Sequence, residues 1–238
     1  MTDQESGADQ AAAFKQATVD LRSEQQASLV RPRYPYSGIA KAFFAGMDIV
    51  AGKKTTLPKA KLLEMLASIP YREWEKNQYA RLTRRYRNLE WVRAAWHVVS
   101  YGRAAQDNEY WHLLVLQEKM KEDGLRDPWY LAQPLPWLMT ATYVLLAKLL
   151  ALASLRRAFL FNAEFEDHAE HEYARFVEEH PEWEGQPVNN AVVATYSSAP
   201  TWADVIRRIG LDERDHRNHS FVLAGMPEHV VPYPGMPE

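Results

Sequence analysis

The sequence predicts an all-α protein, a bundle of four long helices with further helices packed around it. Apolar residues recur at helical spacing through most of the chain, no stretch alternates as a half-buried strand would, and no internal repeat occurs. With 238 residues, of which 47% are hydrophobic, the chain is long enough to enclose one sizeable core.

Composition excludes several classes of protein. The chain carries 28 Lys and Arg against 31 Asp and Glu, so no excess of basic charge favours nucleic acid as a partner. It contains no Cys, which excludes a disulfide scaffold, a cysteine nucleophile, an iron–sulfur cluster and a thiolate zinc site. Neither Gly-rich phosphate-binding motif occurs, and the first residues lack the basic start and apolar stretch of a secretory signal.

Composition along the chain predicts three regions. Residues 1–30 are polar and are expected to form a disordered or loosely helical arm. Residues 31–222 carry the helical pattern and are expected to form the folded domain. Residues 223–238 are rich in Pro and are expected to lack regular structure.

The first half of this domain contains four predicted helices. Thr56 is a suitable N-cap for the predicted helix Lys59–Tyr79, and Pro58 suits its first turn. Pro70 is expected to kink this helix. Gly124 is a suitable stop for the fourth helix. In order, the predicted helices are Ser37–Val50, Lys59–Tyr79, Asn88–His97 and Arg103–Asp123.

The second half contains three predicted helices: Pro134–Leu160, Asn162–His180 and Thr201–Val222. Pro181 ends the second of them. Thr201 and Asp204 form the pattern of a capping box, with Asp in the place of the usual Glu.

Pro134–Leu160 is the most apolar stretch, and within it Trp137–Leu155 runs for 19 residues with Lys148 as its only charge. It suits a membrane span, a buried core helix or a helix lying in the membrane interface. The segment that follows is dense in carboxylates and His and could not lie in lipid, which favours peripheral association. Basic residues available to anionic lipid are Lys53, Lys54, Lys59, Lys61, Arg81, Arg84, Arg85, Arg87, Arg156 and Arg157.

Two Glu-x-x-His pairs lie on separate predicted helices. Residues i and i+3 share a helix face, so both side chains of a pair can reach one ion. Two other helices each carry one Glu flanked by apolar residues. The set in chain order is Glu64, Glu109 with His112, Glu166, and Glu213 with His216. Four Glu and two His from four helices are the ligands of a ferritin-like di-iron carboxylate bundle.

The charge of this set also favours metal. Four carboxylates that converge in a core are strongly disfavoured unless cations neutralise them. Oxygen-rich ligation with imidazole suits iron or manganese, whereas zinc usually takes fewer ligands. We therefore expect two iron ions per chain.

These segments resemble those of the alternative oxidase family, the membrane-bound di-iron quinol oxidases. LLEMLASIP resembles LETVAAVP, NEYWHL resembles NERMHL, FEDHAEHEYARF resembles LEEEAxHxYTxF, and LDERDHRNH resembles RADExxHRDVNH. The similarity covers about Ser37 to Ser220. It implies that the six residues above bind two irons and that the protein is a monotopic homodimer. It also implies a position at the cytoplasmic face of an inner membrane, where quinol is oxidised and O₂ is reduced to water without proton pumping.

The resemblance implies a catalytic role for Tyr173. Tyr173 lies seven residues after Glu166, two helical turns along the same face, so it can approach the metal pair. A buried Tyr that merely has a satisfied hydroxyl is the structural alternative. Asn108 adjoins Glu109 and Asp212 adjoins Glu213, and both could orient ligands, as could Tyr196. His171 and His219 are interpreted as pocket or surface residues rather than ligands.

The quinol pocket that the family implies is altered in this chain. Lys59 stands in place of an Arg, His168 in place of a Glu, and Glu172 in place of a small hydroxyl residue. Leu63 and Phe165 are expected to line the same pocket. The family's Tyr-Trp pair is represented by Tyr196 followed by Ser.

Three functions remain open on the sequence. The first is a non-electrogenic quinol:O₂ oxidoreductase. The second is a di-iron oxygenase, hydroxylase or desaturase that acts on another amphiphilic substrate, which the altered pocket residues motivate. The third is a metal-binding helical module without catalytic activity.

Overall fold

The computed structural model describes residues 19–236, and in this part of the chain the regular elements are all helices, without a β-strand. The sequence-based prediction of an all-α fold is confirmed. The α-helices are α2 (Leu21–Val30), α3 (Gly38–Ala51), α4 (Leu57–Arg85), α5 (Leu89–Glu122), α6 (Leu135–Ala153), α7 (Leu155–Glu178), α8 (Ala191–Tyr196) and α9 (Trp202–Leu223). Short 3₁₀ helices lie at Trp129–Leu131, Pro181–Gly185 and Pro227–His229.

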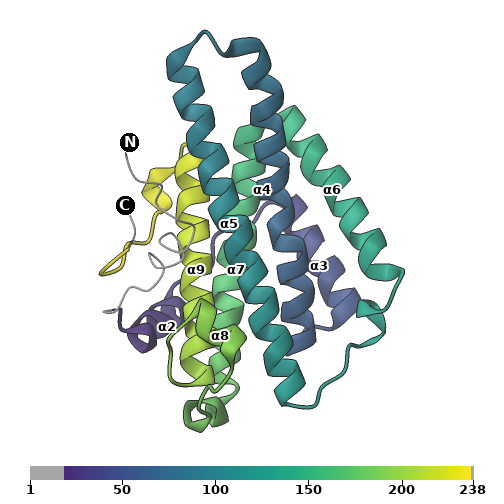
Figure 1. Cartoon of the computed structure of the whole chain (residues 1–238), viewed down its shortest axis with the longest axis vertical. Helices are drawn as coiled ribbons and strands as arrows, with labels where there is room; N and C mark the ends of the chain where they lie inside the picture. The colour runs from purple at the N-terminus through teal and green to yellow at the C-terminus, as the bar shows by residue number, and fades with distance from the viewer. Residues whose placement is uncertain (1–18, 237–238) are drawn as a thin grey trace.

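The long helices α4, α5, α7 and α9 lie side by side at the centre of the molecule (Figure 1). The most extensive packing joins α4 to α5 and α7 to α9, while α4 also contacts α7 and α5 also contacts α9. Helix α6 runs along one side of this group, against α4 and α7, and α2 lies against α7 and α9 on the opposite side. The central helices therefore present one face each to a common interior.

Helix α4 begins as the sequence predicts. The Thr56 side chain accepts a hydrogen bond from the Lys59 backbone N–H, and Pro58 lies in the first turn. The helix includes Pro70 and continues to Arg85, six residues beyond the expected end. Helix α4 packs extensively against α5, and tertiary packing stabilises helices beyond their local sequence preference.

Helix α5 corrects the prediction of two helices between residues 88 and 123. It is a single helix of 34 residues, capped by the Asn88 side chain, which accepts a hydrogen bond from the Trp91 backbone N–H. Gly102 lies between the two predicted helices. It lies where α5 packs against α4, and an added Cβ would come within 3.3 Å of the Tyr71 backbone oxygen. The glycine allows two helices to pack closely rather than ending one.

The predicted helix Pro134–Leu160 is wrong in its extent, because the chain breaks at Ser154. Helix α6 ends there, and the Ser154 side chain caps α7 by accepting a hydrogen bond from the Arg157 backbone N–H. The break allows α7 to turn back into the central group. Helix α7 consequently begins seven residues earlier than the predicted helix at Asn162.

Within the arm that was expected to be disordered or loosely helical, residues 21–30 form the ordered helix α2, while residues 1–18 lie outside the described part. Asp20 caps α2 by accepting hydrogen bonds from two backbone N–H groups. The polar side chains of α2 are partly buried against the central helices: Gln25 donates to the Ala174 carbonyl, and Ser28 donates to Glu170. The polar segment 21–30 thus forms an ordered helix because its side chains hydrogen-bond to buried polar groups of α7.

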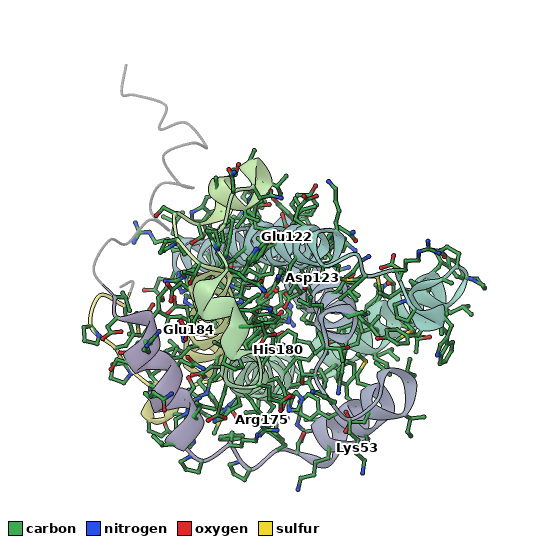
Figure 2. All side chains as sticks on the ribbon, turned by 90° about the horizontal axis from the view of Figure 1, so that it is seen from below. Lys53, Glu122, Asp123, Arg175, His180 and Glu184 are labelled. Carbon is green, nitrogen blue, oxygen red and sulfur yellow. The ribbon has the colours of Figure 1, made fainter. Side chains whose placement is uncertain are left out.

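Two short helices between α7 and α9 were not predicted, Pro181–Gly185 and α8. They cover the lower end of the molecule, where Glu122, Asp123, His180 and Glu184 lie near the ends of the central helices (Figure 2). Trp202 at the start of α9 is fully buried there, and its indole N–H donates to Glu122. This end is therefore closed by the chain itself.

The segment after α9 is irregular apart from the last short 3₁₀ helix, as the sequence predicts. It nevertheless packs on α9. Asn218 donates to the Val231 carbonyl and accepts from the Val231 backbone N–H, and the Tyr233 hydroxyl donates to Asp215. These contacts hold the described part of the C-terminal segment to α9.

Helix α6 is the one described helix that is long and apolar enough to cross a membrane. It is not a core helix, because only 17% of its apolar window is buried. Its outward residues form an exposed apolar face, which we call the α6 outer face: Trp137, Leu138, Leu145, Leu146, Leu149 and Leu152.

Candidate metal centre

The six residues expected to bind metal come together in the interior between α4, α5, α7 and α9. Two overlapping groups of donor atoms form, and within each group all atoms lie within 4.8 Å of one another. The first group contains Glu64, Glu109, His112 and Glu213. The second contains Glu109, Glu166, Glu213 and His216. Glu109 and Glu213 belong to both groups, so the two groups share two carboxylates.

These six side chains are almost completely buried, each with an exposed fraction of 5% or less. Eight of their oxygen and nitrogen atoms have no hydrogen-bond partner in the described structure. An unpaired buried polar atom costs free energy, so such a concentration at one place favours the binding of a ligand there. The atoms are Oε2 of Glu64, both carboxylate oxygens of Glu109 and of Glu213, Oε2 of Glu166, and Nδ1 of His112 and of His216.

The two imidazoles face the carboxylates without forming well-directed hydrogen bonds. Nδ1 of His112 lies 3.1 Å from Glu213 Oε1 and 3.3 Å from Glu64 Oε2. Nδ1 of His216 lies 2.9 Å from Glu109 Oε1 and 3.5 Å from Glu213 Oε2. Donor atoms that surround a common point at these separations can coordinate one ion, and the residues present therefore fit a pair of metal ions.

The pKa directions at the site indicate excess negative charge. Burial raises the pKa of Glu166 well above its usual value, and the neighbouring Glu213 and Glu109 raise it further. Burial lowers the pKa of His216, but Glu109 and Glu213 outweigh it, and the net pKa is raised well above the usual value. Both shifts have the sign expected when carboxylates crowd together in a medium of low dielectric. Divalent cations would neutralise this charge.

Asp212 supports the His112 imidazole from outside the centre. Its Oδ2 atom lies 3.3 Å from His112 Nε2, on the opposite side of the ring from Nδ1. Oδ2 also accepts hydrogen bonds from the Tyr196 hydroxyl at 2.6 Å and from the Asn108 amide at 3.3 Å. Arg208 pairs with the other carboxylate oxygen. The structure thus brings together all three residues that were expected to orient ligands, because Asn108 and Tyr196 both donate to the Asp212 carboxylate.

Helices α4 and α7 each contribute one candidate ligand, and a tyrosine from each of these helices contacts the ligand Glu of the other. The Tyr173 hydroxyl on α7 donates to Glu64 on α4, and the Tyr71 hydroxyl on α4 donates to Glu166 on α7 at 2.7 Å. Both tyrosines are buried. Burial, followed by the charge of the nearest Glu, raises the pKa of each well above its usual value, so both hydroxyls keep their protons.

Tyr71 was missed by the sequence analysis, although a signal was present. Tyr71 follows Glu64 by seven residues, the same spacing that separates Tyr173 from Glu166. Asn162 was also missed. Its amide donates to Glu166 Oε1 at 2.9 Å, and it precedes Glu166 by one helical turn. A search for polar residues on the helix faces of the candidate ligands would have found both.

The altered pocket residues are engaged by other parts of this chain. Lys59 is 3% exposed, and its ammonium donates to Asp48 at 2.7 Å and to the Gly52 carbonyl at 2.8 Å. It therefore joins α3 to α4 rather than facing the centre. Glu172 pairs with Arg33 at 2.5 Å and accepts a hydrogen bond from the Thr55 hydroxyl.

His168 belongs to the same enclosed group. Its Nδ1 atom lies 2.7 Å from the Arg33 guanidinium, and its ring stacks on Phe44 with 4.0 Å between centroids. Burial lowers the pKa of His168 to about 4. Leu63 and Phe165 line a space of only about 10 Å³ beside Glu64, Glu172 and Tyr173. A space of that size holds at most one water molecule.

A third cluster of acidic and imidazole groups, Asp167, Glu170 and His171, is held by arginines. Arg217 donates to Asp167 at 2.7 Å, and Arg31 and Arg214 both pair with Glu170. His171 is buried rather than exposed, with its ring nitrogens 2.6 Å and 3.0 Å from backbone carbonyl oxygens. Because guanidinium groups already neutralise these carboxylates, the cluster has no need of a cation.

Neither a protein-family model nor a curated protein matches this chain in sequence. The functional interpretation of the site therefore rests on its geometry. Buried Glu and His side chains from four helices lie where they could hold metal ions. The donor set, the shared carboxylates and the unpaired buried atoms are the observations that carry the functional argument.

Proposed function

We propose that the protein is a di-iron quinol:O₂ oxidoreductase of the alternative oxidase type, built on a ferritin-like four-helix bundle. The observation that carries the proposal is the convergence of the six donor residues in two groups that share Glu109 and Glu213. When bound, an iron pair supplies the redox chemistry by which electrons from quinol reduce O₂ to water.

The ligand arrangement supports two ions with similar surroundings. Glu64 and His112 would complete one site, and Glu166 and His216 the other, with the two shared carboxylates between them. Four carboxylates balance the four positive charges of two ferrous ions. Carboxylate oxygen with imidazole nitrogen is a donor set that suits iron or manganese.

The surrounding residues would hold the ligands and control protons. Asp212 fixes the orientation of the His112 ring, as outer carboxylates do in other metal sites. The Tyr173 hydroxyl, which donates to Glu64, keeps an O–H next to the centre in a site from which bulk water is excluded. That hydroxyl is placed to transfer a proton during turnover.

Membrane association belongs to the same proposal, because quinols are lipid-soluble. The α6 outer face would lie in the membrane interface, with α6 parallel to the surface rather than across it. Apolar residues that are exposed over a whole helix face commonly mark contact with a membrane or a partner.

Metal analysis tests the proposal directly. Purified protein is expected to contain about two iron ions per chain. Glu166→Ala removes a ligand and is expected to lower the iron content, whereas Glu73→Ala, at a buried Glu on α4 that pairs with Lys76, is expected to leave it unchanged. Full iron in Glu166→Ala would remove Glu166 from the ligand set.

The engagement of Lys59, His168 and Glu172 by other residues favours a second candidate, an oxygenase, hydroxylase or desaturase that uses the same centre on another amphiphile. Turnover with ¹⁸O₂ separates the two candidates. Quinol-dependent O₂ uptake with label only in water and with no organic product besides quinone supports the oxidase. Label in an organic product supports an oxygenase or hydroxylase, and a new double bond in the substrate with label only in water supports a desaturase. Bound iron without turnover would indicate a metal-binding module.

A further inference from the structure

Residues of α3, α4, α6 and α7 line a large apolar cavity that is partly open to the surface. Figure 1 shows α6 running along this side of the molecule. Its volume is about 630 Å³, against about 10 Å³ for the space beside Tyr173. Cavities of 300–1,000 Å³ are typical of small-molecule sites. Its size is therefore sufficient for a substituted aromatic ring with part of an apolar tail.

Aromatic side chains form much of the cavity wall. Phe43 from α3 lies between Tyr143 of α6 and Phe161 of α7, with ring centroids 5.2 Å and 6.0 Å away. Trp74 of α4 contributes another wall. Aromatic rings favour offset or edge-on contacts with a flat ring, so this wall suits a planar ligand better than a flexible chain.

The wall also contains a polar group without a partner. Tyr143 is 5% exposed, and its hydroxyl has no hydrogen-bond partner in the described structure. Burial, and then the charge of Glu166, raises the pKa of Tyr143, so the group remains a protonated donor. A ligand oxygen that accepts this hydrogen bond would satisfy a group that is otherwise left unpaired.

The cavity wall reaches the candidate metal centre through two side chains. The Trp74 ring packs edge-on against Tyr71, with 5.0 Å between centroids, and the Tyr71 hydroxyl donates to Glu166. On its outer side the cavity is bordered by Leu146 of the α6 outer face. It therefore lies between an apolar surface and a ligand of the proposed ion pair.

We infer that this cavity binds a quinone-type substrate, an amphiphile with a planar ring and an apolar tail. A ring oxygen of the substrate would accept a hydrogen bond from the Tyr143 hydroxyl. The choice of ligand rests on the proposed function, and the position rests on the cavity itself. Lys59 and Glu172 are held in ion pairs within the chain, and His168 contacts Arg33, so these side chains are engaged away from a ligand and the apolar cavity offers the open site.

The experiment measures binding of a decyl-substituted 1,4-benzoquinone to the full-length protein by equilibrium dialysis in detergent, without turnover. Tyr143→Phe is expected to weaken binding about fivefold, the effect of one lost hydrogen bond. Its melting temperature without ligand should be unchanged or higher, since the hydroxyl makes no hydrogen bond to lose. Ala147→Phe places a ring in the cavity and should weaken binding by more than about tenfold.

Tyr130→Phe is the matched control. Tyr130 is a buried tyrosine outside the cavity wall, and its variant should bind the quinone as the unaltered protein does. Unchanged affinity in both Tyr143→Phe and Ala147→Phe would overturn the inference. So would loss of binding in Leu63→Trp alone, because Leu63 lines the small space beside Tyr173.

A saturated fatty acid serves as the second probe, because it lacks a ring. Weaker binding of the fatty acid than of the quinone supports the inference, and equal or tighter binding at this cavity overturns the assignment of the ligand class. Dialysis does not depend on iron or O₂ uptake. Loss of the proposed oxidase activity with retained, Tyr143-dependent binding would therefore count against the proposed function and not against the binding site.

Discussion

At the scale of single residues, the centre combines donors that are unpaired with donors that are held in place. The eight unpaired atoms all belong to the six candidate ligands. Their neighbours Tyr71, Tyr173 and Asp212, by contrast, all make hydrogen bonds. This difference is expected of a metal site, where the ligand atoms are free to coordinate an ion and the surrounding groups fix the orientation of the ligands.

Tyr173→Phe separates chemistry from metal binding. The substitution leaves the buried ring in place and removes the hydroxyl that donates to Glu64. We expect normal iron content and a turnover reduced by at least about 100-fold, the usual effect of removing a positioned proton-transfer group. Iron content, melting temperature and quinol-dependent O₂ uptake should be measured on one preparation. Near-normal uptake with full iron would show that Tyr173 is a structural residue, with a cost of about 1 kcal/mol for the lost hydrogen bond.

Asp212→Asn tests the support of His112. Burial opposes the charge of Asp212, but Arg208 and His112 outweigh it and lower the pKa well below its usual value, so the group is a carboxylate at neutral pH. The amide keeps the shape and loses the charge. We expect metal affinity to fall about 10- to 100-fold, as measured by competition with a chelator. Asp215→Asn, the neighbouring carboxylate that accepts from Tyr233, is the control and should bind metal normally.

At the scale of helices, α2 is attached by charges rather than by apolar contacts. Arg214 of α9, which is 1% exposed, donates to Glu170 of α7, to Ser28 and to the Glu24 carbonyl. Removing one partner of such a buried pair leaves an uncompensated charge, which is strongly destabilising. The position of α2 therefore depends on Glu170 remaining ionised.

The attachment of α2 should weaken in acid. Burial alone would raise the pKa of Glu170, but Arg31, Arg214 and Ser28 lower it to about 2. A carboxyl whose pKa is depressed in the folded state stabilises the fold above its unfolded pKa, and this stability is lost as the pH falls from about 4.5 towards 2. The shift corresponds to about 3 kcal/mol. Chemical denaturation across this range should show the loss.

Two variants control for other acidic groups. Glu170→Gln is expected to be less stable at pH 7 and to lose less stability on acidification, because the titrating group is absent. Glu178→Gln, at an exposed position on the same helix, should follow the unaltered protein. An acid dependence in Glu170→Gln as steep as in the unaltered protein would contradict the assignment.

At the scale of the whole molecule, exposed large apolar side chains of the described residues are concentrated along α6. The α6 outer face should carry membrane binding, since each buried Leu contributes about 1.5–3 kcal/mol to transfer from water. Leu145→Glu with Leu149→Glu is expected to reduce co-sedimentation with vesicles of mixed neutral and anionic lipid by more than about tenfold. Val222→Glu, an exposed apolar position on α9, is the control.

The topology of membrane binding can be measured separately. Protease treatment of sealed vesicles that carry the bound protein should cut sites on one side only, because α6 packs along α4 and α7 rather than standing apart from them. Cleavage on both sides would indicate that α6 crosses the bilayer. Equal sedimentation of the α6 double variant and the unaltered protein would move the contact to another surface.

Helix type and the faces of the central helices follow from the sequence itself. Helical spacing, the caps Thr56 and Thr201, and the i, i+3 spacing of each Glu-x-x-His pair are local properties, and they are present in the structure as predicted. The order of Glu64, Glu109, Glu166 and Glu213 along the chain also anticipated which residues would meet, because each lies on a different long helix.

Tertiary structure decided the features that depend on residues distant in sequence. The continuity of α5, the ordered α2 and the break at Ser154 all result from packing against other helices, which overrides local preference. The same holds for Lys59, His168 and Glu172, whose partners Asp48, Arg33 and Thr55 cannot be identified from spacing. Sequence determined which side chains the centre contains, and packing determined which of the surrounding spaces were filled and which remained open. The residues that share one helix face follow from their spacing in the sequence, whereas the size and lining of a cavity depend on how four helices pack together.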